Sequence, residues 1–62
     1  MPMVIVETWP LDEERKPRLI RKITEAFASE GIPAEAVTIV MHESPKQNWG
    51  TGGYQHTVRF GE

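Results

Sequence analysis

One amphipathic helix separates two short β-branched segments, and this order constrains the fold more than any other feature of the sequence. Residues Met3–Thr8 and Val37–Glu43 are rich in Val, Ile and Thr, which favours strands. Two consecutive strands joined through a helix are parallel, and their crossover is right-handed. The sequence therefore predicts a short β-α-β unit of the α/β (α+β) class.

The helix between the strands has clear start and stop signals. Its apolar positions recur with helical spacing, at Leu19, Ile20, Ile23, Ala26 and Phe27. Acidic residues 12–14 precede it and can cap its first turn, and Pro17 is tolerated only in that turn, so we expect the helix to start near Glu14. Gly31 followed by Pro33 is typical of a helix end.

The last part of the chain has the composition of a turn and an arm. Trp49-Gly-Thr-Gly-Gly53 predicts a tight turn, and Tyr54–Phe60 is expected to form a short extended segment or the arm of a hairpin. No repeat, linker or low-complexity tract divides the sequence. We therefore expect residues 1–62 to form a single domain, the β-α-β unit with a C-terminal turn or hairpin arm.

The chain is too short to stabilise this unit by itself. A domain of 62 residues buries only about 60% of its unfolded surface, and such small domains usually need disulfides, a metal or a partner. The sequence has no Cys, and the spacing of its two histidines, His42 and His56, resembles no metal site. A two-stranded parallel sheet also has open edges and one bare face. We therefore expect the sheet to be completed by oligomerisation.

Charge and hydropathy exclude several functional classes. The net charge is −2, which argues against a dedicated nucleic-acid binder although the helix has a basic face. No apolar run approaches the roughly 20 residues of a membrane span, and the N-terminus lacks the basic and apolar regions of a secretory signal. We expect a cytoplasmic protein that acts without a cofactor and binds neither nucleic acid nor membrane.

Pro2 is the one residue that suggests chemistry by its position. It follows the initiator Met1 and opens the first strand, so removal of Met1 would expose a secondary amine held by the sheet. A chain α-amine has an unperturbed pKa of about 7.7–8, and apolar surroundings or nearby positive charge lower it. A base of this kind is suited to moving protons near neutral pH. If Met1 is retained, the nitrogen is an amide and has no useful basicity.

Five segments together resemble the 4-oxalocrotonate tautomerase family. They are Pro2-Met-Val-Ile-Val, Asp12-Glu-Glu-Arg-Lys, Leu19-Ile-Arg-Lys-Ile-Thr-Glu-Ala-Phe27, Val37-Thr-Ile-Val-Met-His-Glu43 and Trp49-Gly-Thr-Gly-Gly53. The resemblance covers nearly the whole chain. It implies a homo-oligomer of β-α-β subunits, usually a hexamer built as a trimer of dimers, with active sites between subunits. It also implies that Pro2 shuttles a proton on an enol acid, that Trp49 forms an apolar wall, and that the Trp9 backbone amide helps to bind substrate.

The sequence departs from this family at two substrate-binding positions. The resemblance implies an arginine in the loop after the first strand and another early in the second strand, but Leu11 and Thr38 occupy those places. Two arginines that bind carboxylates in a bidentate manner are strong and specific ligands. We therefore expect a small, unsaturated, monocarboxylic enol or α-keto acid as substrate, with Thr38 lining the place of an arginine.

Other polar residues have less specific interpretations. Three cations share a helix face that we expect to be solvated: Arg15, Arg18 and Lys22. Lys16 projects onto the apolar stripe and either snorkels or reaches a neighbouring site. Arg59 is expected at the surface or an interface, or alternatively in a partner's pocket. His42 is expected to be a hydrogen-bonded structural histidine rather than an acid–base partner.

Two classes of function remain open on the sequence. The first is an isomerase, a keto–enol tautomerase that uses the amine of Pro2. The second is a non-catalytic oligomeric subunit or binding module of the same fold, or one chain of a heteromeric tautomerase whose partner supplies the arginines. The mass of the intact protein discriminates first, because loss of Met1 frees the amine.

Overall fold

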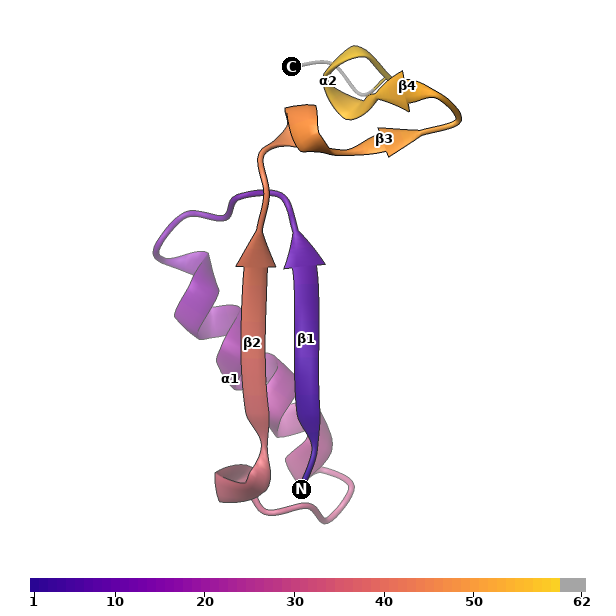
Figure 1. Cartoon of the computed structure of the whole chain (residues 1–62). Helices are drawn as coiled ribbons and strands as arrows, with labels where there is room; N and C mark the ends of the chain where they lie inside the picture. Colours follow the sequence, from indigo (N-terminus) through magenta and orange to yellow (C-terminus); the bar gives the residue numbers. More distant parts are fainter. Residues whose placement is uncertain (60–62) are drawn as a thin grey trace.

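The computed structural model describes residues 1–59, apart from the side chain of Arg59, and is organised around one β-α-β unit (Figure 1). Strand β1 (Met3–Thr8) leads to helix α1 (Arg15–Ala28), and the chain returns through β2 (Thr38–Glu43). The strands are parallel and in register from Met3↔Thr38 to Thr8↔Glu43. The structure thus confirms the predicted unit, with β2 one residue shorter than expected.

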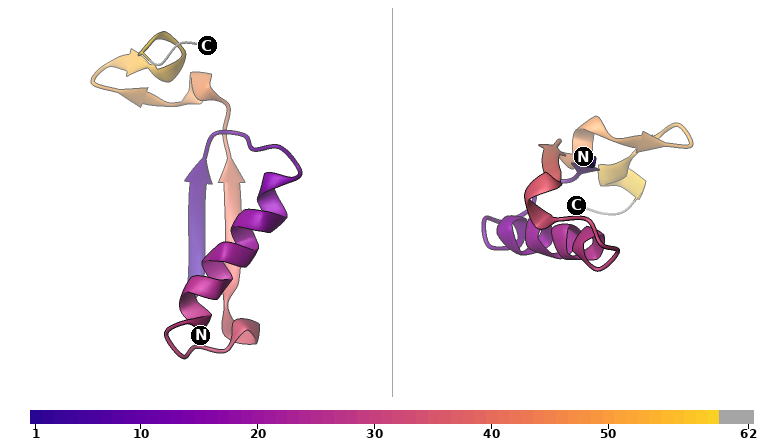
Figure 2. Two further views of the ribbon diagram at one scale, coloured as in Figure 1. Left: turned by 180° about the vertical axis from the view of Figure 1, so that it is seen from behind. Right: turned by 90° about the horizontal axis from the view of Figure 1, so that it is seen from below.

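Helix α1 covers one face of the two strands and leaves the other bare (Figure 2). Along β1 exposure alternates, so Val4 and Val6 face the helix whereas Met3 and Ile5 are 63% and 54% exposed. The period of two in a strand explains this pattern. The bare face of the sheet is therefore apolar over the first half of β1.

Local signals place both ends of α1. Asp12 Oδ1 accepts a hydrogen bond of 2.8 Å from the Arg15 backbone amide, and Glu14 occupies the cap position, as the sequence predicts. At the other end Gly31 has a φ of 91°, a backbone conformation that glycine adopts without strain. A short 3₁₀ turn, η1 (Ala34–Ala36), then leads into β2.

The C-terminal arm extends beyond the ends of the strands (Figure 1). It contains η2 (Lys46–Asn48), the antiparallel strands β3 (Gly50–Thr51) and β4 (Tyr54–Gln55), and the one-turn helix α2 (His56–Arg59). The hairpin confirms one of the two predicted forms of the arm. The expectation of extended structure beyond Gln55 is wrong for residues 56–59, which form α2 directly after the last hairpin hydrogen bond, from the His56 amide to the Trp49 carbonyl (2.9 Å). Phe60 lies outside the described residues.

The described part of the chain has no hydrophobic core of its own, because no hydrophobic side chain in it is buried. The accessible area of the chain is 4644 Å², against about 4,100 Å² for a compact chain of this mass. The radius of gyration is 14.7 Å, against about 11 Å expected for a compact domain of this length. This shape agrees with a subunit that is completed by other copies. No helix in the described part is long and apolar enough to span a bilayer.

Candidate active site

Pro2 and Thr38 lie together at the starting end of the parallel strands. The Thr38 backbone amide donates a hydrogen bond of 3.0 Å to the Pro2 carbonyl, so Pro2 is tied to the sheet immediately before β1 begins. Pro2 is half-buried, whereas Met1 is 91% exposed. With Met1 attached, the Pro2 nitrogen is an amide, so any basic role requires its removal.

Trp9 and Trp49 lie at the opposite end of the strands, where both of their rings contact the ring of His56. The ring centroids of Trp9 and His56 are 5.6 Å apart in an edge-on arrangement, and those of Trp49 and His56 are 5.8 Å apart. Trp9 follows Pro2 by seven steps of extended chain, about 23 Å at the usual rise per residue. One chain therefore holds the four site residues expected from the sequence as two pairs at opposite ends of its sheet.

At the end of the strands where Trp9 lies, residues of the C-terminal arm contact Trp9 and one another. His56 is the buried polar residue of the described chain (9% exposed), and its Nε2 lies 2.8 Å from Thr51 Oγ1. Trp49 Nε1 donates to the Ser44 carbonyl at 3.1 Å. The Nζ atom of Lys46 lies 4.4 Å from the centroid of the Trp9 ring, a cation–π distance. We call Trp9, Lys46, Trp49 and His56 the aromatic cluster.

Lys46 and His56 were not singled out as site residues from the sequence. His56 had a usable signal, because a two-residue Gly52-Gly53 turn pairs Thr51 with Tyr54 and so brings Trp49 opposite His56. For Lys46 no such signal exists, since its contact with Trp9 spans two elements that are distant in sequence.

On the bare face of the sheet, His42 is paired with Glu7. His42 Nδ1 and Glu7 Oε2 are 2.8 Å apart, and the two residues are partners in the strand register. The hydrogen bond agrees with the expectation of a hydrogen-bonded histidine. The pair lies several residues along the strands from Pro2, and therefore does not contact the nitrogen of that residue.

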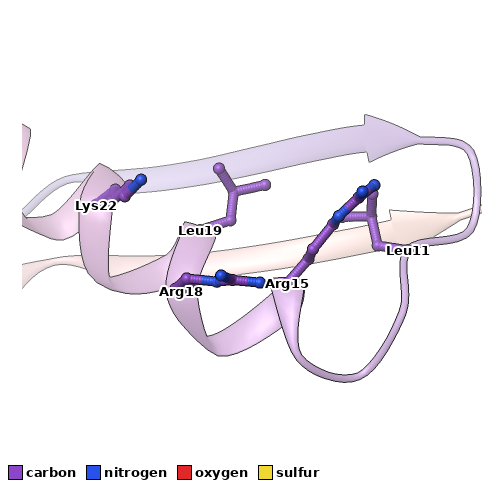
Figure 3. A pocket seen from close by; sticks show the side chains of 5 residues that line it. All are labelled: Leu11, Arg15, Arg18, Leu19 and Lys22. Atoms are coloured by element: carbon purple, nitrogen blue, oxygen red, sulfur yellow. The ribbon is translucent and has the colours of Figure 1, made fainter.

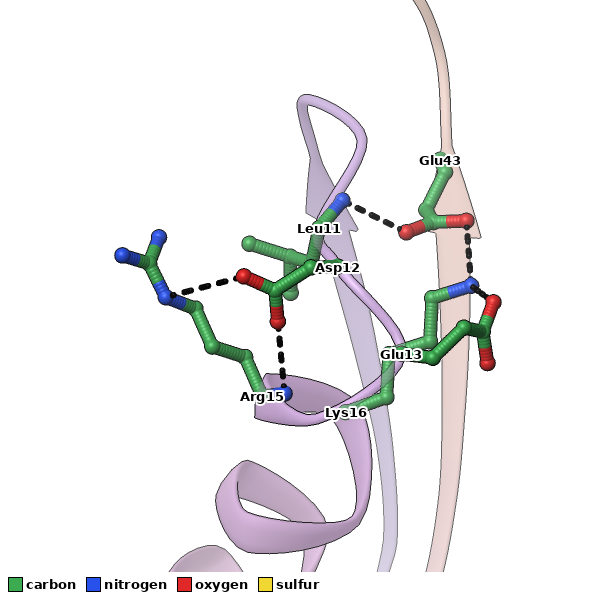
Figure 4. Close-up of polar contacts among 6 residues, drawn as sticks. All are labelled: Leu11, Asp12, Glu13, Arg15, Lys16 and Glu43. Atoms are coloured by element: carbon green, nitrogen blue, oxygen red, sulfur yellow. Dashed lines mark hydrogen bonds and ion pairs between the residues drawn. The ribbon is translucent and has the colours of Figure 1, made fainter.

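On the helix side of the sheet, Glu43 ties three segments together (Figure 4). Its carboxylate accepts a hydrogen bond from the Leu11 backbone amide at 2.8 Å and forms an ion pair with Lys16 Nζ at 3.0 Å. These contacts, the Leu11 bond first, hold the pKa of Glu43 below its ordinary value. The hydrogen bond to Glu43, followed by that to Glu13, raises the pKa of Lys16. Carboxylates of the same chain thus hold the Lys16 ammonium, which is consistent with snorkelling.

The basic face of α1 adjoins an open cavity of about 410 Å³. Figure 3 shows its lining, Leu11, Arg15, Arg18, Leu19 and Lys22. The cavity contains none of the four expected site residues, and Arg15 Nε lies 3.6 Å from Asp12 Oδ2. These cations are exposed, as the sequence predicts for a solvated face. The side chain of Arg59 lies outside the described part of the structure.

These features define a class of protein: a small β-α-β chain with a two-stranded parallel sheet, and with the residues predicted to form a site in two groups at opposite ends of that sheet. The sequence profile of the family described as "Tautomerase enzyme" matches residues 2–59. The chain therefore belongs to the tautomerase family, and the family predicted from its residues is confirmed. It is a tautomerase-type enzyme in fold and family, and its substrate is a separate question.

Individual relatives support the same assignment. The chain is 40% identical over 42 residues to the 2-hydroxymuconate tautomerase of Comamonas testosteroni, covering 66% of this chain and 67% of the relative. A 4-oxalocrotonate tautomerase isozyme structure from Methylibium petroleiphilum matches with a TM-score of 0.83 and 33% identity, over 98% of this chain and all of that one. TomN, a 4-oxalocrotonate tautomerase homologue in the tomaymycin biosynthetic pathway, matches with a TM-score of 0.87 and 25% identity, over 98% and 97% of the two chains.

Proposed function

We propose that the protein, once Met1 is removed, is a keto–enol tautomerase in which the Pro2 amine is the general base and acid. The amine accepts the hydroxyl proton of an enol acid and returns a proton to carbon, so the substrate is isomerised with no change in composition. The observation that carries this proposal is the position of Pro2, at the head of β1 and fixed through its carbonyl to Thr38. A base held in this way does not need to be ordered when substrate binds.

The active site is composite in this proposal. Pro2 and Thr38 of one copy meet Trp9 and Trp49 of another, because in one chain these pairs are about 23 Å apart along the sheet. Trp49 excludes water from the amine, and the Trp9 backbone N–H donates to the substrate. A homo-oligomer, with a hexamer as the expected form, supplies both ends together and covers the bare apolar face of each sheet.

The substrate is a small unsaturated acid with one carboxylate. A relative that is 40% identical carries the name 2-hydroxymuconate tautomerase, which supports a hydroxylated unsaturated acid as the chemical class. Leu11 and Thr38, where the family resemblance implies arginines, favour a monocarboxylate such as phenylenolpyruvate over a dicarboxylate.

The test is ketonisation of phenylenolpyruvate and of 2-hydroxymuconate, followed by ultraviolet absorbance. The protein is first shown by intact mass to lack Met1. Pro2→Ala is expected to abolish turnover, and Pro17→Ala, an exposed proline of α1, is the matched control that leaves it unchanged. Turnover that persists in Pro2→Ala, or none in the processed protein, contradicts the proposal.

A second candidate is one subunit of a heteromeric tautomerase. The observation that favours it is the occupation of both arginine positions by uncharged residues, Leu11 and Thr38. In that case the purified chain alone is inactive after loss of Met1, and mixing it with a partner chain that carries the arginines restores Pro2-dependent turnover.

A further inference from the structure

Lys46 is positioned by the same elements that build the aromatic cluster. It begins η2, is half-buried, and its carbonyl accepts a hydrogen bond of 3.0 Å from the Trp49 amide. Its Nζ atom lies 4.4 Å from the centroid of the Trp9 ring. The backbone of Lys46 is therefore tied to one tryptophan and its ammonium to the other.

This ammonium differs from the other described cations in its location. The remaining cationic side chains that the structure describes belong to α1: Arg15, Lys16, Arg18, Arg21 and Lys22. Among the described residues, Lys46 is thus the cation that accompanies the two residues expected to contact substrate, Trp9 and Trp49.

We propose that Lys46 binds the substrate carboxylate. It would thus replace the arginines that the family resemblance implies at the positions of Leu11 and Thr38, which carry no charge. This inference rests on the proposed function and deepens it, because it gives the composite site a single cation. One ammonium matches one carboxylate, since lysine is a compact point charge whereas arginine offers a bidentate fork. The Trp9 ring beneath the ammonium supplies an apolar floor for the unsaturated part of the substrate.

The same position would assist the chemical step. When another copy brings its Pro2 to the aromatic cluster, the Lys46 charge disfavours protonation of the amine, because like charges repel. Lys46 then acts on both the substrate carboxylate and the fraction of amine that is free to accept a proton.

The alternative role for Lys46 is mechanical, a brace that only orients the Trp9 ring. Lys46→Met tests this point, because it keeps an unbranched side chain over the ring and removes the charge. Lys46→Arg restores a cation, and Lys22→Met removes an exposed lysine of α1 and serves as the matched control.

The experiment is calorimetric titration of each processed variant with phenylpyruvate and with its uncharged methyl ester. Lys46→Met is expected to bind phenylpyruvate about tenfold or more weakly, since a hydrogen bond to a charged group is lost. The methyl ester should bind Lys46→Met as tightly as it binds the wild type. Lys46→Arg should recover most of the affinity for the acid, and Lys22→Met should change neither ligand.

Three outcomes overturn the inference: an equal loss for acid and ester, no loss for the acid, or no binding of phenylpyruvate to the wild type. Phenylpyruvate is the product of the ketonisation and undergoes no net turnover at its keto–enol equilibrium, so its binding decides the role of Lys46 even where Pro2→Ala shows that catalysis does not depend on the amine. Conversely, turnover can depend on Pro2 while Lys46→Met binds phenylpyruvate as the wild type does. That combination supports the tautomerase proposal and contradicts only the proposed role of Lys46.

Discussion

Glu7 and His42 are hydrogen-bonded across the two parallel strands, 2.8 Å apart, on the sheet face that α1 leaves uncovered. The same face exposes Met3 and Ile5. In the proposed oligomer another copy covers this apolar face, so both polar side chains lose water and each then depends on the other for a partner. An oligomer that covers this face must therefore keep the hydrogen bond between Glu7 and His42.

Glu7→Ala is expected to weaken self-association, because it leaves His42 without its carboxylate in a covered face. The loss of a partner in such a place costs roughly 1–3 kcal/mol per site. Sedimentation equilibrium measures the association constant. Glu25→Ala, on the exposed surface of α1, is the control. Unchanged association in Glu7→Ala would show that this face stays in water.

Glu43→Gln tests the bridge between Leu11, Lys16 and β2 through its pH dependence. The pKa of Glu43 is lowered in the folded chain from its ordinary value of 4.5. The carboxylate therefore stabilises the fold at a pH above that value, and this stabilisation is lost as the pH falls through the folded-state pKa. The variant should therefore unfold at a lower temperature than the wild type at pH 7, and the difference should shrink toward pH 3.

Thermal unfolding followed by circular dichroism at both pH values provides the measurement. Glu30→Gln, an exposed residue in the turn after α1, controls for the general effect of removing one negative charge. A difference between Glu43→Gln and the wild type that is equal at pH 7 and pH 3 is incompatible with a charge-dependent bridge.

His56→Ala is expected to loosen the aromatic cluster, because the imidazole contacts both Trp9 and Trp49. His56→Phe keeps an aromatic ring at this position and loses the hydrogen bond with Thr51 Oγ1. The near-ultraviolet circular dichroism of the tryptophans should diminish in the Ala variant and persist in the Phe variant, with turnover reduced about tenfold or more only in the former. Equal spectra in the two variants would show that the ring does not order the cluster.

Gly53→Ala tests the turn that brings His56 to Trp49. Gly53 has a φ of 87°, and nothing lies within 4 Å of an added Cβ, so the substitution introduces backbone strain without a clash. The expected cost is about 1–2 kcal/mol. Gly50→Ala is the matched control, because Gly50 has no positive φ and its added Cβ meets the Tyr54 carbonyl at an ordinary 3.5 Å. Unfolding in urea measures both variants, and equal stability would mean that the turn tolerates alanine.

Interactions between near neighbours in sequence explain why so much of the fold could be predicted. The alternation of β1, the start of α1 at Asp12 and Glu14, and its end at Gly31 each depend on a few adjacent residues. A helix between two strands then leaves one simple topology, and the family could be recognised from the same segments. The short helix α2 (His56–Arg59) was missed because a single helical turn is too short to show the apolar periodicity that predicts a helix.

The sequence by itself determined the β-α-β unit, the tight glycine turn and the candidate proline, because periodicity, capping and backbone freedom act over a few residues. Only the tertiary structure decided that Pro2 and Trp9 lie at opposite ends of one sheet, that Glu43 holds the Leu11 amide, and that Lys46 lies over Trp9. These relationships join segments far apart in the chain. Their partners are selected by the packing of whole elements, which no local pattern of residues encodes.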